Sequence, residues 1–137
     1  MAEHALSSGD TAKAREIAEQ LLDTAGRYGV HKYIAVAHKI MAQIAVAERN
    51  TNLAEAEFTA ALGELQKYPV PVETWKTYAE LGRLKSSVGD VSAARDAFAR
   101  AAEIVNGIAA NVADAGLRET FLNSDAVREV MAAAQRP

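Results

Sequence analysis

The stretch DVSAARDAFARAAEIVN, residues 90–106, has two looser counterparts in the same chain at a fixed spacing. They are NTNLAEAEFTAALGELQ at 50–66 and DTAKAREIAEQLLDTAG at 10–26. The copies thus begin at residues 10, 50 and 90, and the equal offset between these starts is the repeat period. Four aligned columns hold apolar residues, namely Ala14, Ala54 and Ala94; Ala18, Phe58 and Phe98; Leu21, Ala61 and Ala101; and Ala25, Leu65 and Val105. Such self-similarity is typical of a solenoid, whose repeats bury their apolar faces against one another. The sequence therefore predicts a recognition scaffold.

Composition narrows the class of protein further. A length of 137 residues suits one domain. The chain has no cysteine, which excludes disulfides, thiolate zinc sites and cysteine nucleophiles and fits a cytoplasmic location. The net charge is -3, and the 15 Lys and Arg residues are dispersed, which argues against nucleic-acid binding. No apolar run approaches the roughly 18 residues of a membrane span, and residues 1–10 do not resemble a secretory signal.

Apolar residues recur every three or four positions between short breaks, as in Ile17, Leu21, Leu22 and Ala25. This spacing places one apolar face on a helix, and no comparable stretch alternates as a strand would. The sequence therefore predicts an all-α fold. The expected helices span 1–8, 11–27, 31–48, 52–68, 71–88 and 91–112.

Residues with capping chemistry stand at these boundaries. Asn52 and Glu55 have the spacing of a capping box, in which each side chain accepts a hydrogen bond from a free backbone N–H. Pro71 suits the first turn of a helix, because its ring fixes a helical φ. Asp10 and Asp90 each follow a glycine and are expected to cap the next helix.

The repeat stops after Val112. Asp114 and Ser124 are expected to cap two short helices, the first carrying Leu117, Phe121 and Leu122, and the second Val127, Val130, Met131 and Ala134. An open solenoid end exposes an apolar face, so an amphipathic segment of this kind is expected to cover it. The polar side of the segment would be supplied by Arg118, Glu119, Arg128 and Glu129.

The segment LGRLKSSVGDVSAARDAFARAAEI, residues 81–104, resembles the tetratricopeptide repeat. The family pattern is carried by Leu81-Gly82, Gly89-Asp90, Ala94, Phe98 and Ala101. Small residues stand where two helices approach closely, and the aromatic residue fills the space beside them. The usual period of the family is about 34 residues. The offset between residues 50 and 90 of this chain is longer, which implies longer helices. The resemblance implies an α-α superhelix in a single domain over 1–137, with a truncated repeat at 1–30, repeats at 31–70 and 71–112, and a C-terminal cap at 113–137.

The tail from Ile108 resembles the end of tetratricopeptide regions in large bacterial regulators. Met1 aligns with the middle of a first helix, which implies that the chain is the C-terminal piece of a longer array. Because the first repeat lacks about two turns, an exposed apolar face at that end would favour a homodimer.

In this family the first helix of each pair lines a concave groove that binds extended peptides or helices. The resemblance places Lys39 and Gln43 on one helix of the groove, and Lys76, Glu80 and Arg83 on the next. The three cations would attract an acidic segment or a terminal carboxylate. Gln43 and Glu80 stand where carboxylate-clamping members have asparagines, so that particular clamp is not expected.

Other polar residues favour ordinary structural roles. His4, His31 and His38 are too far apart for an i, i+4 metal pair, so they are expected on helix surfaces or between helices. Trp75 lies on an apolar stripe and is expected in the core. Carboxylates such as Glu57 decorate helix faces. The sequence predicts no catalytic residue, metal or cofactor.

Three alternatives stay open at this point. The array could act as a spacer or dimerisation module without a peptide ligand. It could be a small-molecule-binding helical bundle, which would need a closed apolar cavity. It could also be an armadillo- or HEAT-like array, which shares the period but does not account for the Gly-Asp, Ala and Phe columns.

Overall fold

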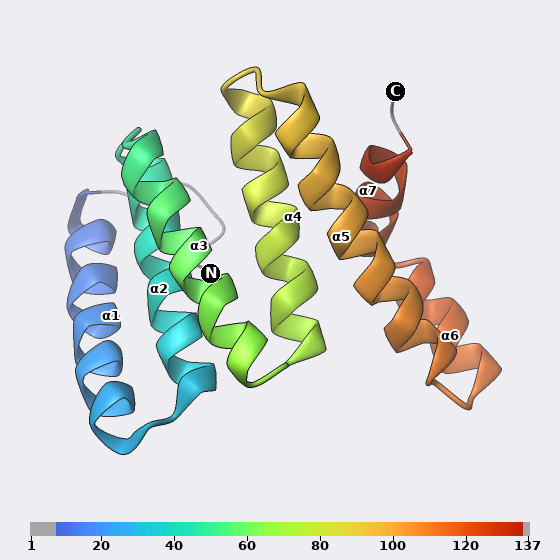
Figure 1. Ribbon diagram of the computed structural model, residues 1–137, viewed down its shortest axis with the longest axis horizontal. Helices are drawn as coiled ribbons and strands as arrows, with labels where there is room; N and C mark the ends of the chain where they lie inside the picture. The colour runs from blue at the N-terminus through green and yellow to red at the C-terminus, as the bar shows by residue number, and fades with distance from the viewer. Residues whose placement is uncertain (1–7, 136–137) are drawn as a thin grey trace. The chain divides into compact units, whose positions relative to one another are not determined.

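The computed structural model describes the backbone of residues 8–135 and the side chains of residues 11–135 (Figure 1). This part of the chain is helical and contains no strand, so the predicted all-α class is confirmed. The helices are α1 (Ser8–Tyr28), α2 (His31–Ala47), α3 (Thr51–Lys67), α4 (Pro71–Ser87), α5 (Val91–Ala110), α6 (Ala115–Leu122) and α7 (Asp125–Ala134).

The observed bounds of α2 to α5 lie within two residues of those expected from the sequence. The start of α1 differs, because the helix runs through Gly9 and Asp10 without a break. The prediction that Asp10 caps a helix there is therefore wrong. One glycine costs a helix only about 1 kcal/mol, which the alanine-rich residues that follow can outweigh. The expected helix at 1–8 and His4 lie outside the described residues, apart from Ser8.

The chain divides into two compact units, Met1–Val70 and Pro71–Pro137. The division falls at the Pro-Val-Pro break, which is also the expected border between the repeats at 31–70 and 71–112. The first unit holds α1, α2 and α3, and the second holds α4 to α7. The superhelix and the single domain over 1–137 remain predictions.

In the first unit, α2 packs against both α1 and α3 (Figure 1). Buried alanines dominate these helices, with Phe58 as the largest side chain, 1% exposed. A cluster of Ala35, Ala61 and Leu65 packs with Val70. Small side chains let the helix axes approach closely. Ile17 was expected to face the core, but half of its surface is exposed to solvent.

In the second unit, α4 and α5 form a hairpin that packs tightly at Gly82. A Cβ atom built on Gly82 would lie 2.8 Å from Cε2 of Phe98. Since Phe98 stands one repeat period after Phe58 and both are buried, the two aromatic residues occupy matching positions in the two hairpins.

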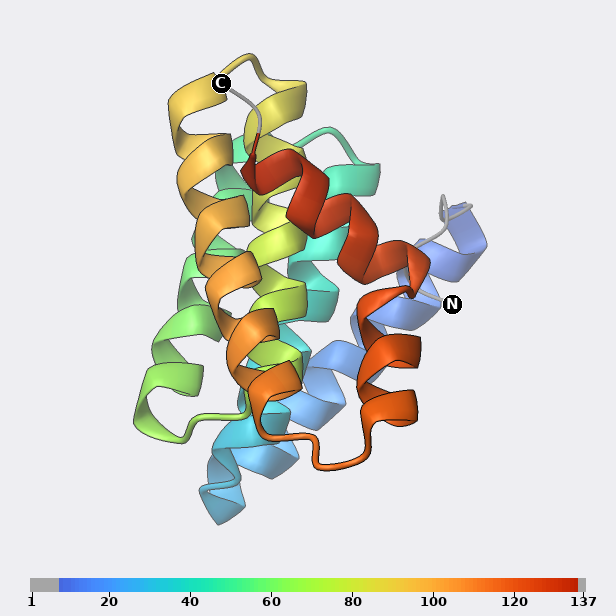
Figure 2. The same cartoon turned by 90° about the vertical axis from the view of Figure 1, so that its right-hand side faces the viewer.

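The C-terminal helices cover one apolar face of this hairpin. Figure 2 shows α7 alongside α5, and Val127 and Val130 of α7 are fully buried in a cluster with Trp75 and Phe98. Phe121 of α6 meets the Trp75 ring edge-on, with ring centroids 6.4 Å apart. Two predictions are thereby confirmed within this unit: Trp75 belongs to the core, and the tail covers an apolar face.

Both hairpins turn in the same way. Arg49 and Gly89, which are separated by one repeat period, adopt the left-handed conformation, with φ of 60° and 82°. In each turn the next residue donates a backbone hydrogen bond back to the preceding helix, from Asn50 N to the oxygen of residue 45 at 2.8 Å and from Asp90 N to that of residue 85 at 2.9 Å. These are the bonds of a Schellman motif, which ends a helix at a left-handed residue.

The cap of α3 differs from the predicted one. Asn50 is the N-cap, and its side chain accepts a hydrogen bond from Leu53 N at 3.3 Å. Asn52 lies inside the first turn of α3, so the Asn52–Glu55 capping box is wrong. The reason is backbone conformation: a cap residue has non-helical φ and ψ, and residue 50 acquires them from the turn at Arg49.

The other caps follow the sequence more closely. Asp90 accepts from Ala93 N at 3.1 Å, and Asp114 accepts from Leu117 N at 2.9 Å, as predicted. Ser124 is the N-cap of α7, but its hydroxyl donates to the oxygen of residue 121 and makes no capping bond.

Arg118 has a structural role that the sequence did not reveal. It was expected on the polar side of the tail, yet it is partly buried and binds the C-terminal end of α5. Its Nε donates to Ala109 O at 3.0 Å, and its Nη2 donates to Val112 O at 2.6 Å. Ala109 lies in the last turn of α5 and Val112 just beyond its end, so Arg118 ties α6 to the backbone at the C-terminus of α5.

Candidate functional site

The residues expected to line a groove are distributed over the two units. Lys39 and Gln43 lie one turn apart on α2 and are partly buried. Lys76, Glu80 and Arg83 lie on α4 at spacings of four and three residues, which places them along one face of that helix. Each helix therefore brings its own members together, and a groove shared by the two sets remains a prediction.

Arg83 has a partner on α7. Its Nε donates to Oε1 of Glu129 at 2.8 Å, and the two side chains are 46% and 52% exposed. An exposed pair of this kind contributes about 0 to 1 kcal/mol to stability. A ligand carboxylate at Arg83 would therefore displace Glu129 at small cost.

Two histidine–glutamate pairs, which were not predicted from the sequence, join α2 to α3. His31 pairs with Glu64, and His38 pairs with Glu57. The two histidines are seven positions apart, and so are the two glutamates in reverse order. Antiparallel helices in register place such residues opposite one another, so the matching spacing was the signal in the sequence.

The His31 pair lies at the end of the hairpin. His31 Nδ1 is 2.6 Å from Oε2 of Glu64, and the imidazole stacks on Tyr68 with ring centroids 4.2 Å apart. The hydrogen bond with His31 holds the pKa of Glu64 below its ordinary value, and the charge of Lys67 acts in the same direction. Because an ionised carboxylate only accepts, Nδ1 carries the donated proton.

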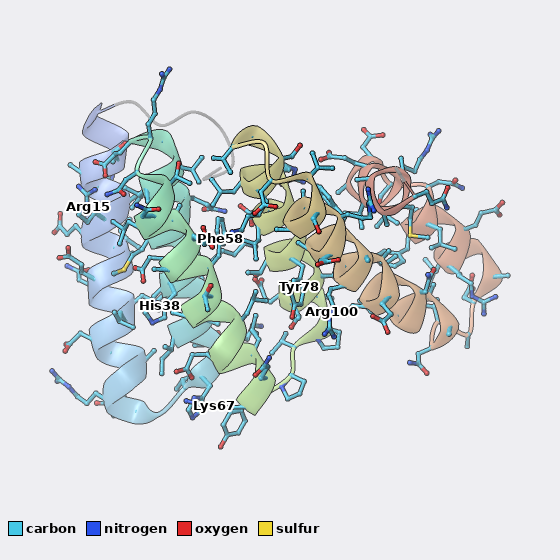
Figure 3. All side chains as sticks on the ribbon, turned by 45° about the horizontal axis from the view of Figure 1, so that its top comes forward. Arg15, His38, Phe58, Lys67, Tyr78 and Arg100 are labelled. Carbon is cyan, nitrogen blue, oxygen red and sulfur yellow. The ribbon has the colours of Figure 1, made fainter. Side chains whose placement is uncertain are left out.

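The second pair lies near the middle of α2. His38, labelled in Figure 3, places Nδ1 3.1 Å from Oε1 of Glu57 on α3, and both side chains are mostly buried. Glu57 is therefore not the plain solvent-facing carboxylate that the sequence suggested. It contacts His38 and also lines a pocket.

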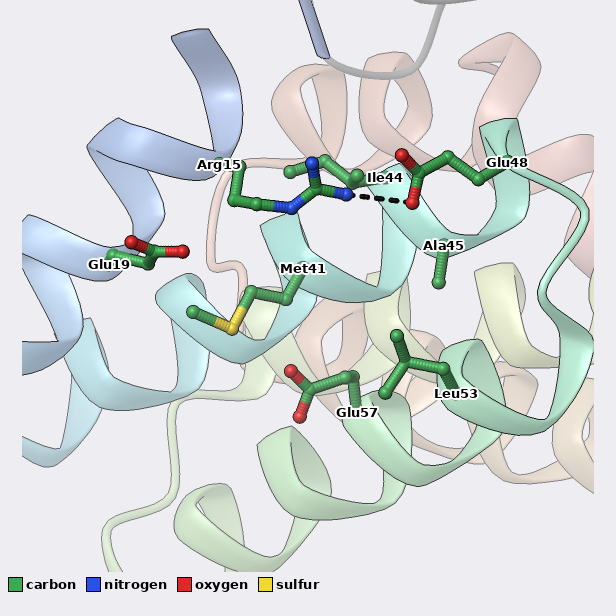
Figure 4. Close-up of a pocket in the computed structure, with 8 residues that line it drawn as sticks. All are labelled: Arg15, Glu19, Met41, Ile44, Ala45, Glu48, Leu53 and Glu57. Carbon is green, nitrogen blue, oxygen red and sulfur yellow. Dashed lines mark hydrogen bonds and ion pairs between the residues drawn. The ribbon is translucent and has the colours of Figure 1, made fainter. Parts of the chain in front are cut away.

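This pocket lies among α1, α2 and α3, entirely within the first unit (Figure 4). It has a volume of about 110 Å³ and opens to solvent. Its lining consists of Arg15, Glu19, Met41, Ile44, Ala45, Glu48, Leu53 and Glu57. Apolar side chains thus form part of the surface, and four ionisable side chains form the rest.

One ion pair neutralises part of that charge. Nη2 of Arg15 lies 2.7 Å from Oε1 of Glu48 across the pocket. The hydrogen bond to Glu48, together with its charge, raises the pKa of Arg15 above its ordinary value. Glu19 on α1 and Glu57 on α3 are the other two carboxylates, and Figure 4 shows them on either side of the Met41 side chain.

The pocket and the expected groove residues use opposite sides of α2. Met41 and Ala45 line the pocket at a four-residue spacing. At 3.6 residues per turn, Lys39 and Gln43 fall about half a turn away from them. The first unit therefore has two separate candidate surfaces.

Comparison of the chain with protein-family models, curated proteins and solved structures found no match. Within the part of the chain that the structure describes, no three metal-ligating side chains gather. None of the helices described has the length and apolar character needed to cross a bilayer.

Proposed function

We propose that the chain is a non-catalytic scaffold, similar to tetratricopeptide arrays, that binds a peptide or protein segment along α2 and α4. In this proposal it works in the cytoplasm as part of a larger bacterial regulatory protein. The groove is lined by Lys39, Gln43, Lys76, Glu80 and Arg83.

One observation carries this proposal: the two hairpins are the same structural unit. α2 and α4 begin at His31 and Pro71, and α3 and α5 begin at Thr51 and Val91, so both pairs of starts are separated by one repeat period. The turn between the two helices of each pair has a residue in the left-handed conformation at the same position of the repeat. A buried phenylalanine also recurs at the same position of the repeat in both hairpins. Repeated helix pairs usually serve as binding surfaces, which supports recognition over chemistry.

The pocket in the first unit bears on the small-molecule alternative. Cavities that bind drug-sized ligands usually measure about 300 to 1,000 Å³ and enclose most of the ligand. The pocket among α1, α2 and α3 is smaller and open. It suits one side chain of a partner better than a whole small molecule.

The proposal is tested with a phage-displayed library of random peptides selected on the full chain. Binding of the enriched peptides is then measured for Lys39→Ala, Gln43→Ala, Lys76→Ala and Arg83→Ala. We expect at least one variant on each helix to weaken binding about fivefold or more, as for an interface hot spot. Lys13→Ala and Arg100→Ala, exposed on α1 and α5, are the controls. Peptides that bind all variants equally would favour the spacer.

A further inference from the structure

We infer that the pocket among α1, α2 and α3 receives a lysine side chain of a bound protein segment. This inference goes beyond the groove, because the pocket lies on the opposite side of α2. Each proposal is tested by its own variants, so the failure of one leaves the other standing.

Negative charge predominates in the pocket. The pocket contains three glutamates and one arginine, and Arg15 is already paired with Glu48 at 2.7 Å. Glu19 also acts on Arg15 through its charge, but with three carboxylates against one guanidinium the pocket keeps an excess of negative charge. His38 contacts one carboxylate oxygen of Glu57, with Nδ1 3.1 Å from Oε1. A positively charged group between α1 and α3 would complement the excess negative charge, and a carboxylate or phosphate would be repelled.

The pocket also has an apolar lining. Met41, Ile44 and Ala45 lie on α2, and Leu53 lies on α3 with 46% of its surface exposed. An unbranched chain of methylenes can pack on such residues while the charged head stays near water. Covering the exposed part of Leu53 would add a favourable apolar contribution.

The placement of the carboxylates favours lysine over arginine. Lysine carries a compact ammonium with three donors on a flexible stem. Arginine carries a planar fork of donors, whose geometry matches the two oxygens of a single carboxylate. Here the two available carboxylates come from different helices, on either side of Met41 (Figure 4). A point charge that donates in several directions fits two separated acceptors better than a fork does.

The experiment uses the methyl groups of methionine as reporters. The chain has three methionines, of which Met41 lines the pocket and Met131 lies on α7 in the second unit. The full chain, labelled with ¹³C at the methionine methyls, is titrated with acetyl-Gly-Lys-Gly-amide at millimolar concentrations. We expect the Met41 signal to shift and saturate while the Met131 signal stays in place.

Two comparison peptides test the chemistry. The norleucine peptide keeps the stem but lacks the ammonium, and the arginine peptide keeps the charge but changes its shape. We expect both to bind more weakly than the lysine peptide, and added salt to weaken only the charged ones. A Met41 shift that is absent, or equally strong with norleucine, would overturn the inference. Tighter binding of the arginine peptide would overturn the choice of lysine.

Variants then locate the cation. Glu19→Gln and Glu57→Gln should each weaken binding of the lysine peptide about two- to fivefold, the range for partly exposed ion pairs. Glu16→Gln, an exposed neighbour on α1, is the matched control and should bind as the natural protein does. Glu19→Gln leaves the His38 contact intact, so it remains informative if Glu57→Gln unfolds. Unchanged binding by Glu19→Gln would contradict the proposed position of the ammonium.

Discussion

Gly82 of α4 faces the ring of Phe98 on α5 so closely that even one added methyl group would collide with the ring. An added Cβ would lie 2.8 Å from Cε2 and 2.9 Å from Cδ2 of that ring. We expect Gly82→Ala to destabilise the protein by about 1 to 3 kcal/mol, the usual cost of overpacking a core. Urea denaturation followed by the fluorescence of Trp75, the single tryptophan, measures this change.

Gly107→Ala is the control for Gly82→Ala. Gly107 also lies inside a helix, α5, but nothing lies within 4 Å of an added Cβ. Alanine is favoured over glycine in a helix by about 1 kcal/mol, so this variant should be more stable than the natural protein. Equal effects of the two substitutions would contradict the close approach at Gly82.

The turn at Arg49 contains backbone strain that the equivalent turn at Gly89 avoids. Both residues have positive φ, and a side chain in this conformation costs about 1 to 2 kcal/mol. We expect Arg49→Gly to raise the free energy of unfolding by about 1 kcal/mol and Gly89→Arg to lower it by a similar amount. Arg49→Ala keeps the strain without the guanidinium, so in thermal denaturation it should resemble the natural protein. Stabilisation by Arg49→Ala would assign the effect to the side chain.

The cap of α3 provides a test of two neighbouring asparagines. Asn50 accepts a hydrogen bond from Leu53 N, whereas Asn52 lies within the helix. Asn50→Ala should cost about 1 kcal/mol. Asn52→Ala should be neutral or slightly stabilising, because alanine has the higher helix propensity. The midpoint of urea unfolding distinguishes the two variants. A larger loss of stability for Asn52→Ala than for Asn50→Ala would support the capping box predicted from the sequence.

Arg118 offers a test of how the tail is attached. Its guanidinium donates to Ala109 O and Val112 O, and hydrogen bonds from a charged group each contribute about 1.5 to 3 kcal/mol. Arg118→Ala should therefore destabilise the second unit by about 2 kcal/mol. Arg128→Ala, exposed on α7, should change stability by less than about 0.5 kcal/mol. Trp75 fluorescence in urea reports both, and equal losses would mean that Arg118 acts only through its charge.

The part of the fold that depends on local pattern could be predicted from the sequence. The stripes and breaks located α2 to α5, and Asp90 and Asp114 were identified as caps because their side chains act within one turn. Features that depend on tertiary register were missed. Glu57 could be assigned to His38 only after α2 and α3 were aligned, and Arg118 reaches Ala109 only because the chain reverses after α5.

The same limit applies to the candidate sites. The groove residues come from a resemblance, which assigns positions on a helix but does not place one hairpin against the next. The pocket could not be found in the sequence at all. Its lining joins Glu19, Met41 and Glu57 from three helices, and no short spacing connects them. Such a site becomes visible only when the packing of α1, α2 and α3 is known.

The pair of His31 and Glu64 makes stability depend on pH. Since the hydrogen bond with His31 lowers the pKa of Glu64 in the folded state, its contribution is complete above the ordinary glutamate value of about 4.3. It is lost as the pH falls through the lower, folded value. We therefore expect the difference in unfolding free energy between the natural protein and Glu64→Gln to shrink as the pH falls from about 6 to 3. Urea titrations across this range measure it. In a His31→Ala background the same comparison should lose most of its pH dependence, and a full dependence there would show that His31 is not the cause.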